Sequence, residues 1–268
     1  MTRPAGPGAA GAGRASPGGA WLVGQPPRAE AVAGVSLYCF PHAGGTPGEF
    51  VRWSQDLPGV RVRAVQPPGR ASRLFEPPLR RMADLVDALV AAIGTETAVR
   101  EGRVAFAGHS LGALVAFEVA RTMEARGVPG PDRLVVSACP APPEAVPPGG
   151  VLHLLPDLEL LREIGRRWGP LPEEIRADPE LLAYTLRGFR ADLEALETYR
   201  YVPGPPVRCG IVAIGGTGDP AAARMDRWSA HTAGPFALHT LPGGHFYFRD
   251  RRLETLRLLH TAITGPGP

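Results

Sequence analysis

The sequence contains no lysine, so arginine supplies all 29 of its basic residues. Arginine is scattered among the acidic residues instead of being clustered with aromatic ones, and the formal net charge is only +3. Nucleic-acid binding is therefore poorly supported, because it requires a concentrated basic surface. No apolar run approaches the roughly 18–20 residues of a membrane-spanning helix, so we expect no contact with a membrane.

Cysteine is scarce as well, and Cys39, Cys139 and Cys209 each lie in or beside an apolar stretch. Their odd number and the lack of metal-ligand spacing favour reduced thiols in a cytoplasmic protein. We interpret them as small core residues, with a catalytic cysteine as the less favoured alternative. The sequence also lacks HExxH, paired CxxC, GxGxxG and P-loop motifs. We therefore expect neither a metal nor a bound cofactor.

The 268 residues are 44% hydrophobic and 21% charged. This composition suits one α/β domain, with room for an inserted subdomain. The first 33 residues are rich in glycine, alanine and proline and lack the continuous apolar stretch of a signal peptide. We predict a disordered leader over residues 1–33 and a folded domain over residues 34–268.

Apolar, strand-like segments alternate with helical segments along most of the chain. Strands are predicted at residues 35–40, 60–65, 104–107, 134–138, 211–214 and 236–241, with helical spacing at 79–93, 111–126 and 252–263. This alternation predicts a largely parallel sheet with helices on both faces. Such sheets carry their sites at the carboxyl ends of the strands. The residues with candidate chemistry each follow a predicted strand: Ala43, Ser110, Asp219 and His245.

Residues 140–206 interrupt the alternation, because their pattern is helical with no convincing strand. Asp178 is typical of a helix N-cap, and Pro179 of the first helical position. An apolar stripe follows at Leu182, Leu186, Phe189, Leu193 and Leu196. These helices either pack on the core of the main domain or form a lid over the strand ends. We favour the lid, because the segment lies between two strands of the sheet.

The stretch Gly108-His109-Ser110-Leu111-Gly112 joins a predicted strand to a predicted helix. A Gly-x-Ser-x-Gly turn at such a junction forces the serine into a strained conformation with its hydroxyl exposed, and it is typical of a nucleophile. The flanking glycines let the strand and the helix approach without a Cβ clash. The helix N-terminus adds a field that favours negative charge. A chance match in a glycine-rich chain is the alternative, and the flanking strand and helix argue against it.

A serine hydroxyl needs a base, and that base needs a carboxylate partner. His245 lies in a glycine-rich loop after the last predicted strand, which fits the hydrolase order of serine, acid and histidine. Asp219 follows the strand at 211–214, and we predict that it orients His245. The competing acids are Asp226, Asp250 and Glu144. An oxyanion hole of this kind uses two backbone N–H donors. The residue after the serine, Leu111, is expected to supply one, and Ala43, in the loop after the first strand, the other.

These motifs resemble those of the type II (external, proofreading) thioesterases of polyketide and nonribosomal peptide assembly lines. The likeness covers residues 36–263 and includes Pro41-His42-Ala43-Gly44-Gly45, Gln66-Pro67-Pro68-Gly69-Arg70, the serine motif, Gly218-Asp219-Pro220 and Gly243-Gly244-His245-Phe246. The sequence departs from the family pattern in a slightly shorter segment between Asp219 and Trp228. The combination of the serine motif with PHAGG and QPPGR is far more specific than the serine motif alone.

The resemblance implies an α/β-hydrolase fold with an inserted helical lid at about residues 140–206. It implies hydrolysis of aberrant or stalled acyl groups from the phosphopantetheine arm of acyl or peptidyl carrier proteins. It assigns Ser110, Asp219 and His245 to a catalytic triad. We expect a monomer, and Arg70 and Arg73 are candidates for contact with an acidic carrier protein, with solvated surface arginines as the commoner explanation.

Three other functions are compatible with all or part of the predicted site. A carboxylesterase or lipase uses the same triad on oxygen esters. A product-releasing acyltransferase or cyclase uses the same acyl-enzyme with a nucleophile other than water. A non-catalytic hydrolase-like binding protein is the third alternative, but such proteins typically lose a triad member, and none is missing from this sequence.

Overall fold

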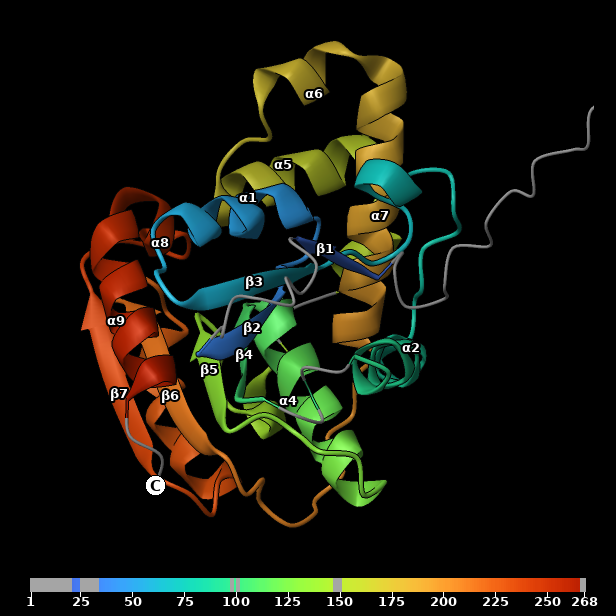
Figure 1. Ribbon diagram of the computed structural model, residues 1–268. Helices are drawn as coiled ribbons and strands as arrows, with labels where there is room; N and C mark the ends of the chain where they lie inside the picture. The colour runs from blue at the N-terminus through green and yellow to red at the C-terminus, as the bar shows by residue number, and fades with distance from the viewer. Residues whose placement is uncertain (1–20, 25–33, 97–98, 100–101, 147–150, 266–268) are drawn as a thin grey trace, which may run out of the picture.

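A sheet of seven strands forms the centre of the part of the chain that the structure describes (Figure 1). The structure is a computed structural model, and it describes residues 21–24, 34–96, 99, 102–146 and 151–265. The strand order is β1-β3-β2-β4-β5-β6-β7. The strands are β1 (Leu22–Gly24), β2 (Val35–Phe40), β3 (Val60–Val65), β4 (Val104–His109), β5 (Arg133–Ser137), β6 (Gly210–Gly216) and β7 (Phe236–Leu241). All six strands predicted from the sequence are present, and they run parallel to one another.

The prediction of a disordered leader is wrong for residues 21–24. Strand β1 pairs antiparallel with β3 at the edge of the sheet, with Leu22 opposite Val65. Leu22 is buried, and the guanidinium of Arg73 lies 4.5 Å from the ring centroid of Trp21. A short apolar segment inside a glycine-rich and proline-rich stretch therefore finds a partner strand. Residues 1–20 and 25–33 lie outside the described part of the chain.

Helices cover both faces of the sheet, as the alternating pattern predicts. Helices α2 (Met82–Gly94) and α4 (Leu111–Ala125) cover one face, and α1 (Pro47–Val51), α8 (Tyr247–Asp250) and α9 (Arg252–Thr264) cover the other (Figure 1). In β2 all six residues are buried, and Tyr38 and Leu37 face opposite layers of the core. A parallel strand buried on both faces needs such a continuous apolar run.

Three helices fill the segment between β5 and β6, where the sequence predicts helices without strands. They are α5 (Asp157–Trp168), α6 (Glu173–Ala177) and α7 (Pro179–Glu197). The side chain of Asp178 accepts hydrogen bonds from the N–H groups of Glu180 and Leu181, at 2.9 and 3.0 Å. The predicted N-cap is thus present. These helices have an apolar cluster of their own, made of Leu152, Leu160, Ile164, Leu186, Phe189 and Leu193.

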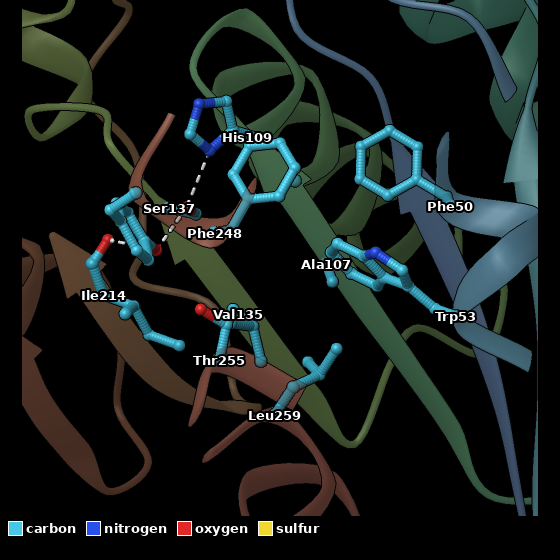
Figure 2. A pocket seen from close by; sticks show the side chains of 12 residues that line it. Phe50, Trp53, Ala107, His109, Val135, Ser137, Ile214, Phe248, Thr255 and Leu259 are labelled. Atoms are coloured by element: carbon cyan, nitrogen blue, oxygen red, sulfur yellow. Dashed lines mark hydrogen bonds between the residues drawn. The ribbon is translucent and has the colours of Figure 1, made fainter. Parts of the chain in front are cut away.

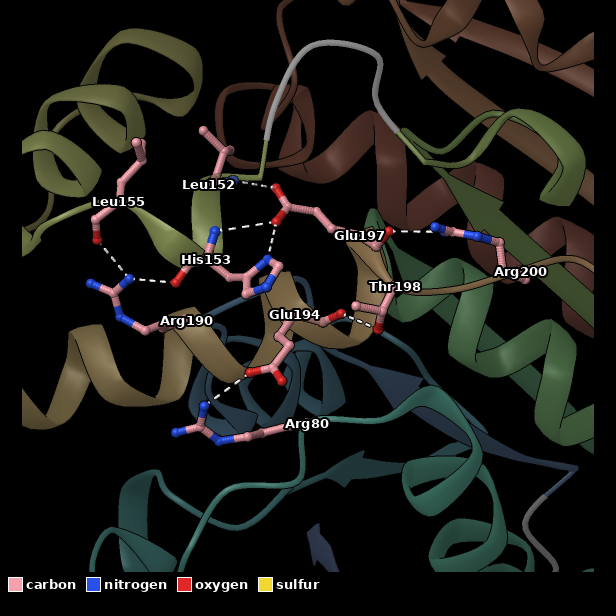
Figure 3. A network of polar contacts seen from close by, with 9 residues as sticks. All are labelled: Arg80, Leu152, His153, Leu155, Arg190, Glu194, Glu197, Thr198 and Arg200. Carbon is pink, nitrogen blue, oxygen red and sulfur yellow. Dashed lines mark hydrogen bonds and ion pairs between the residues drawn. The ribbon is translucent and has the colours of Figure 1, made fainter.

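Short 3₁₀ helices complete the described structure at η1 (Arg52–Gln55), η2 (Ala71–Arg73), η3 (Pro142–Glu144), η4 (Leu152–Leu154), η5 (Ala222–Arg224) and η6 (Asp226–His231). Glu197, the last residue of α7, fastens η4 to this helix (Figure 3). Its carboxylate accepts from the N–H groups of Leu152 and His153 and lies 2.5 Å from His153 Nδ1. Among the described residues, no helix has the length and apolar character needed to cross a bilayer.

Candidate active site

Ser110 occupies the turn between β4 and α4 with φ 54° and ψ −123°. A positive φ is rare for a residue with a side chain, and it persists only where the surroundings enforce it. Here the N–H of Ser110 donates to the carbonyl of Ser137 at 2.8 Å, at the end of the neighbouring strand β5. The serine is therefore held at the carboxyl edge of the sheet in a strained conformation, as the motif predicts.

The two glycines of the motif are required by close backbone contacts. A Cβ atom at Gly108 would lie 2.2 Å from the carbonyl oxygen of Gly112. A Cβ atom at Gly112 would lie 2.1 Å from the carbonyl oxygen of Phe40 in β2. The start of α4 can approach the strand ends this closely only because neither position carries a side chain.

Asp219 and His245 are brought together from the ends of β6 and β7. His245 Nδ1 lies 2.8 Å from Asp219 Oδ2, and the aspartate is buried. Their two loops are joined by a backbone bond from Gly218 N–H to the carbonyl of Gly243 at 2.8 Å. With Nδ1–H donating to the carboxylate, the Nε2 atom of His245 is free to accept a proton. The structure therefore places the predicted base and the predicted acid side by side.

The competing acids lie elsewhere. Glu144 forms an ion pair with Arg227 and lies 3.8 Å from Arg224. Asp226 is exposed at the start of η6, and Asp250 is exposed at the end of α8. None of the three hydrogen-bonds to His245 among the described contacts.

The loop of residues 42–45 lies beside Ser110 in a tight turn, in which the N–H of Gly45 donates to the carbonyl of His42 at 2.8 Å. Ala43 and Ser110 line the same pocket. Leu111 begins α4, so its N–H is one of those without an intrahelical acceptor. Within the described residues, no protein acceptor is found for the N–H of Ala43 or that of Leu111. Both donors are available to a ligand oxygen.

Ser110 and His245 open onto a pocket of about 650 Å³ between the sheet edge and the helices that follow β5. One part of its wall is apolar and comes from α5, α6, α7 and the loop between α5 and α6: Ile164, Trp168, Leu171, Ile175, Phe189, Leu193 and Leu196. Another part is charged and comes from the opposite layer of helices: Glu49, Arg52, Arg249 and Arg252. A ligand with an apolar chain and an anionic end would match both parts of the wall.

Glu49 connects this charged part to the loop of residues 42–45, which we name the oxyanion loop after its predicted role. Arg249 Nε donates to Glu49 Oε1 at 2.8 Å, and His42 Nε2 lies 3.5 Å from Glu49 Oε2. Burial alone would raise the pKa of Glu49, but the hydrogen bonds from His42 and Arg249 outweigh it and lower the pKa to about 2. Glu49 is therefore a carboxylate at neutral pH.

Sequence reasoning treats His109 only as the neighbour of Ser110, yet its ring also contacts that of His245, with centroids 5.0 Å apart. Figure 2 shows its Nδ1 directed at Ser137 Oγ, at 2.8 Å. Ser137 Oγ is 2.6 Å from the hydroxyl of Tyr247, which donates to the carbonyl of Ile214. Burial, followed by the charges of His245, His42 and Arg249, lowers the pKa of His109 well below 6.5. A neutral ring with hydrogen on Nδ1 satisfies this chain from end to end. Its position within the serine motif was the only signal in the sequence.

The prediction that Arg70 contacts a carrier protein is wrong. The side chain is buried and forms a bidentate ion pair with Asp192 of α7, at 2.7 and 2.8 Å. Arg73 is also largely covered, since it binds Glu76 and the carbonyl of Gln66. Sequence spacing could not reveal the partner of Arg70, because Asp192 lies on a helix far along the chain.

The three cysteines are free and buried, which agrees with their interpretation as core residues. Burial raises the pKa of the Cys139 and Cys209 thiols to about 12. Burial raises the pKa of Cys39 as well. Thiols of this kind are protonated at neutral pH and do not act as nucleophiles.

The mostly parallel sheet, with helices on both faces and with Ser110, Asp219 and His245 following its strands at the carboxyl edge, defines an α/β-hydrolase fold. Comparison with known proteins gives the family. The chain matches the thioesterase domain over residues 35–263 and belongs to the thioesterase family. It is a type II thioesterase, an enzyme that hydrolyses thioesters.

Its similarity to individual members spans nearly the whole chain. It is 42% identical to thioesterase PikA5 of Streptomyces venezuelae over 239 residues, which cover 87% of this chain and 83% of the relative. The type II thioesterase BorB from the borrelidin biosynthetic cluster superposes with a TM-score of 0.77 at 36% identity, covering 93% of this chain and 98% of BorB. RedJ from the prodiginine pathway of Streptomyces coelicolor has a TM-score of 0.78 at 34% identity, covering 96% of this chain and 91% of RedJ.

Proposed function

We propose that this enzyme removes acyl groups from the phosphopantetheine arm of acyl or peptidyl carrier proteins, through Ser110, His245 and Asp219. The observation that carries the proposal is the 2.8 Å contact between His245 and Asp219 at the pocket that also contains Ser110. The similar structures of BorB, from the borrelidin biosynthetic cluster, and ClbQ, from the colibactin NRPS/PKS pathway, support this choice of substrate.

The first half of the reaction forms an acyl-enzyme. His245 Nε2 takes the proton of the Ser110 hydroxyl as Oγ attacks the thioester carbonyl carbon. The carbonyl oxygen becomes an oxyanion, and the N–H groups of Ala43 and Leu111 stabilise it. When the tetrahedral intermediate collapses, the C–S bond breaks and the imidazolium protonates the leaving thiolate. Asp219 stabilises the imidazolium throughout.

The second half releases the acid. Water loses a proton to His245 Nε2 and attacks the carbonyl carbon of the acyl-Ser110 ester. The same two N–H groups hold the second oxyanion, and His245 returns the proton to Ser110 Oγ as the ester bond breaks. The products are a carboxylic acid and the restored serine hydroxyl.

The two parts of the pocket wall suit the two ends of such a substrate. The apolar residues of α5, α6 and α7 would surround the acyl chain, and the whole insertion would act as its lid. The exposed side chain of Arg52, together with Arg249 and Arg252, would attract the phosphate of the arm at the opposite side. These rim arginines replace Arg70 and Arg73 as candidates for contact with the carrier.

The test measures hydrolysis of acyl-loaded carrier proteins by the wild type, Ser110→Ala and Ser229→Ala, the last being an exposed serine. We expect hydrolysis by the wild type and Ser229→Ala only, with a preference for short, unextended acyl groups. Full activity in Ser110→Ala would show that the nucleophile is assigned wrongly. Acyl-pantetheine with and without its 4′-phosphate should differ in KM, and the phosphorylated form should have the lower value.

The same panel separates the alternatives. Faster turnover of p-nitrophenyl esters than of acyl-carrier thioesters would indicate a general carboxylesterase. Acyl transfer to an added amine or alcohol in preference to water would indicate an acyltransferase or cyclase. Failure to detect an acyl-Ser110 adduct by intact mass, together with absence of turnover, would indicate a binding protein.

A further inference from the structure

The oxyanion loop is fastened to α7 by a buried side chain. Asp192 Oδ2 accepts a hydrogen bond from the N–H of Gly44 at 2.7 Å. Arg70 binds both oxygens of the same carboxylate and also donates from Nη1 to the carbonyl of Gly45, at 3.2 Å. Three separate parts of the chain therefore meet at this ion pair: the loop of residues 42–45, the loop after β3, and α7.

Close packing surrounds the same contact. Gly44 has φ +71°, and a Cβ atom there would lie 2.3 Å from Cδ2 of Phe189. A Cβ atom at Gly188 would lie 3.2 Å from the carbonyl oxygen of Gly69. One face of α7 thus rests directly on both loops, with no room for a side chain between them.

We propose that Arg70 and Asp192 are positioning residues for the oxyanion hole, acting through Gly44 and Gly45. This inference rests on the proposed role of the Ala43 N–H as an oxyanion donor. The turn of residues 42–45 has an internal bond from Gly45 to His42, and the ion pair supplies two external anchors at its far end. Fixing the peptide groups on the C-terminal side of Ala43 limits rotation of its own N–H.

The pair also has a favourable charge for this position. A lone Asp192 carboxylate beside the loop would repel the oxyanion, and Arg70 neutralises it through a bidentate contact. A cavity of only about 20 Å³ touches Arg70, Asp192 and Leu111, so the pair also borders the second donor. Oxyanion donors contribute most where they are held in place before the reaction, as the ion pair would hold this loop. The consequence is that α7, a helix of the insertion, is coupled directly to catalytic geometry.

The test compares Arg70→Met/Asp192→Leu with the wild type and with Arg80→Met/Glu194→Leu. Both pairs join α7 to the segment between β3 and α2, but the Arg80–Glu194 pair, at 2.9 Å, is more exposed and has no bond to the loop of residues 42–45 among the described contacts (Figure 3). Apolar side chains of similar volume often replace a buried ion pair without loss of stability. Hydrolysis of propionyl-N-acetylcysteamine gives kcat and KM, and inhibition by phenylboronic acid reports affinity for a tetrahedral adduct on Ser110.

We expect kcat of the Arg70/Asp192 variant to fall roughly 10- to 100-fold, somewhat less than the effect of deleting an oxyanion donor. KM should be unchanged, and the Ki of phenylboronic acid should rise by the same factor as kcat falls. Tm should fall only modestly, because one backbone donor, the N–H of Gly44, loses its acceptor. The Arg80/Glu194 variant should match the wild type in all four quantities. A kcat loss without a change in Ki would overturn the inference, because it would show that the oxyanion hole is intact.

A folded Arg70/Asp192 variant with wild-type kcat would also overturn it, while leaving the role of Ser110 untouched. Activity in Ser110→Ala would instead overturn the proposed function. If the double variant does not fold, Asp192→Asn decides, because it keeps the shape of the side chain and removes the charge. A fall in kcat matched by an equal rise in Ki would then support the inference, and wild-type values for both would contradict it.

Discussion

Single residues at the strand-to-helix turn determine whether the site can form at all. The sequence predicts the strained serine and its flanking glycines because each has a local cause: φ 54° at Ser110, and carbonyl oxygens 2.1–2.2 Å from the Cβ positions at Gly108 and Gly112. The same local reading misses His109, because its role depends on Ser137 and Tyr247 from two other elements. A motif therefore predicts its own backbone geometry better than it predicts the contacts that its side chains make with other elements.

Gly112→Ala should destabilise the enzyme by roughly 3 kcal/mol or more, because the new methyl group meets the backbone of β2 and cannot be accommodated by a rotamer change. Gly165→Ala is the matched control, since this glycine lies within α5 and no atom lies within 4 Å of its Cβ position. The control should be more stable by up to about 1 kcal/mol, the helix propensity difference. Urea denaturation of both variants measures this. Equal stabilities would contradict the close contact.

At the scale of elements, helix α7 both lines the pocket and contacts the oxyanion loop. Its start at Asp178 and Pro179 and its apolar stripe are predicted from the sequence, because capping and periodicity are local properties. Three of its polar contacts are not predicted: Asp192 to the oxyanion loop, Glu197 to η4, and Arg190 to the carbonyls of His153 and Leu155. Such contacts join segments that are distant in sequence, and charged residues on a helix more often face solvent.

Glu197→Gln should loosen η4 and the start of α5 from α7. The carboxylate accepts from two backbone N–H groups and from His153, and an amide places an NH₂ donor against one of them. The expected cost is about 1–3 kcal/mol, the range for a buried donor that loses its acceptor. Hydrogen exchange at residues 152–164 should become faster. Glu194→Gln, three residues earlier on the helix and paired with the exposed Arg80, should leave exchange there unchanged.

For the whole molecule, the sequence predicts the order of strands and helices along the chain. It does not predict the contacts between segments that are distant in sequence. Alternating apolar segments predict six parallel strands and the edge of the sheet at which Ser110, Asp219 and His245 lie. The antiparallel edge strand β1 is missed, because three residues carry too little pattern to stand out from a glycine-rich stretch. The buried position of Arg70 is missed for a related reason. A basic residue near a loop looks exposed until the fold supplies its acidic partner.

The buried imidazole of His109 makes the stability of the whole fold depend on pH. Its pKa is well below 6.5 in the native enzyme, first because of burial and then because His245, His42 and Arg249 lie nearby. The unfolded chain binds a proton at this residue near pH 6.5, and the native chain does not. Stability is therefore lost as the pH falls below about 6.5, until the native pKa is reached, by up to about 1.4 kcal/mol per pH unit.

His109→Gln should remove this contribution, so that its free energy of unfolding falls less steeply than that of the wild type below pH 6.5. His239→Gln is the control, because this histidine is exposed on β7 and should leave the profile of the wild type unchanged. Urea denaturation from pH 7.5 to pH 4.5 measures all three proteins. Parallel curves for the wild type and His109→Gln would mean that the ring takes up a proton in the native state. That proton would have to go to Nε2, which has no hydrogen-bond partner among the described residues.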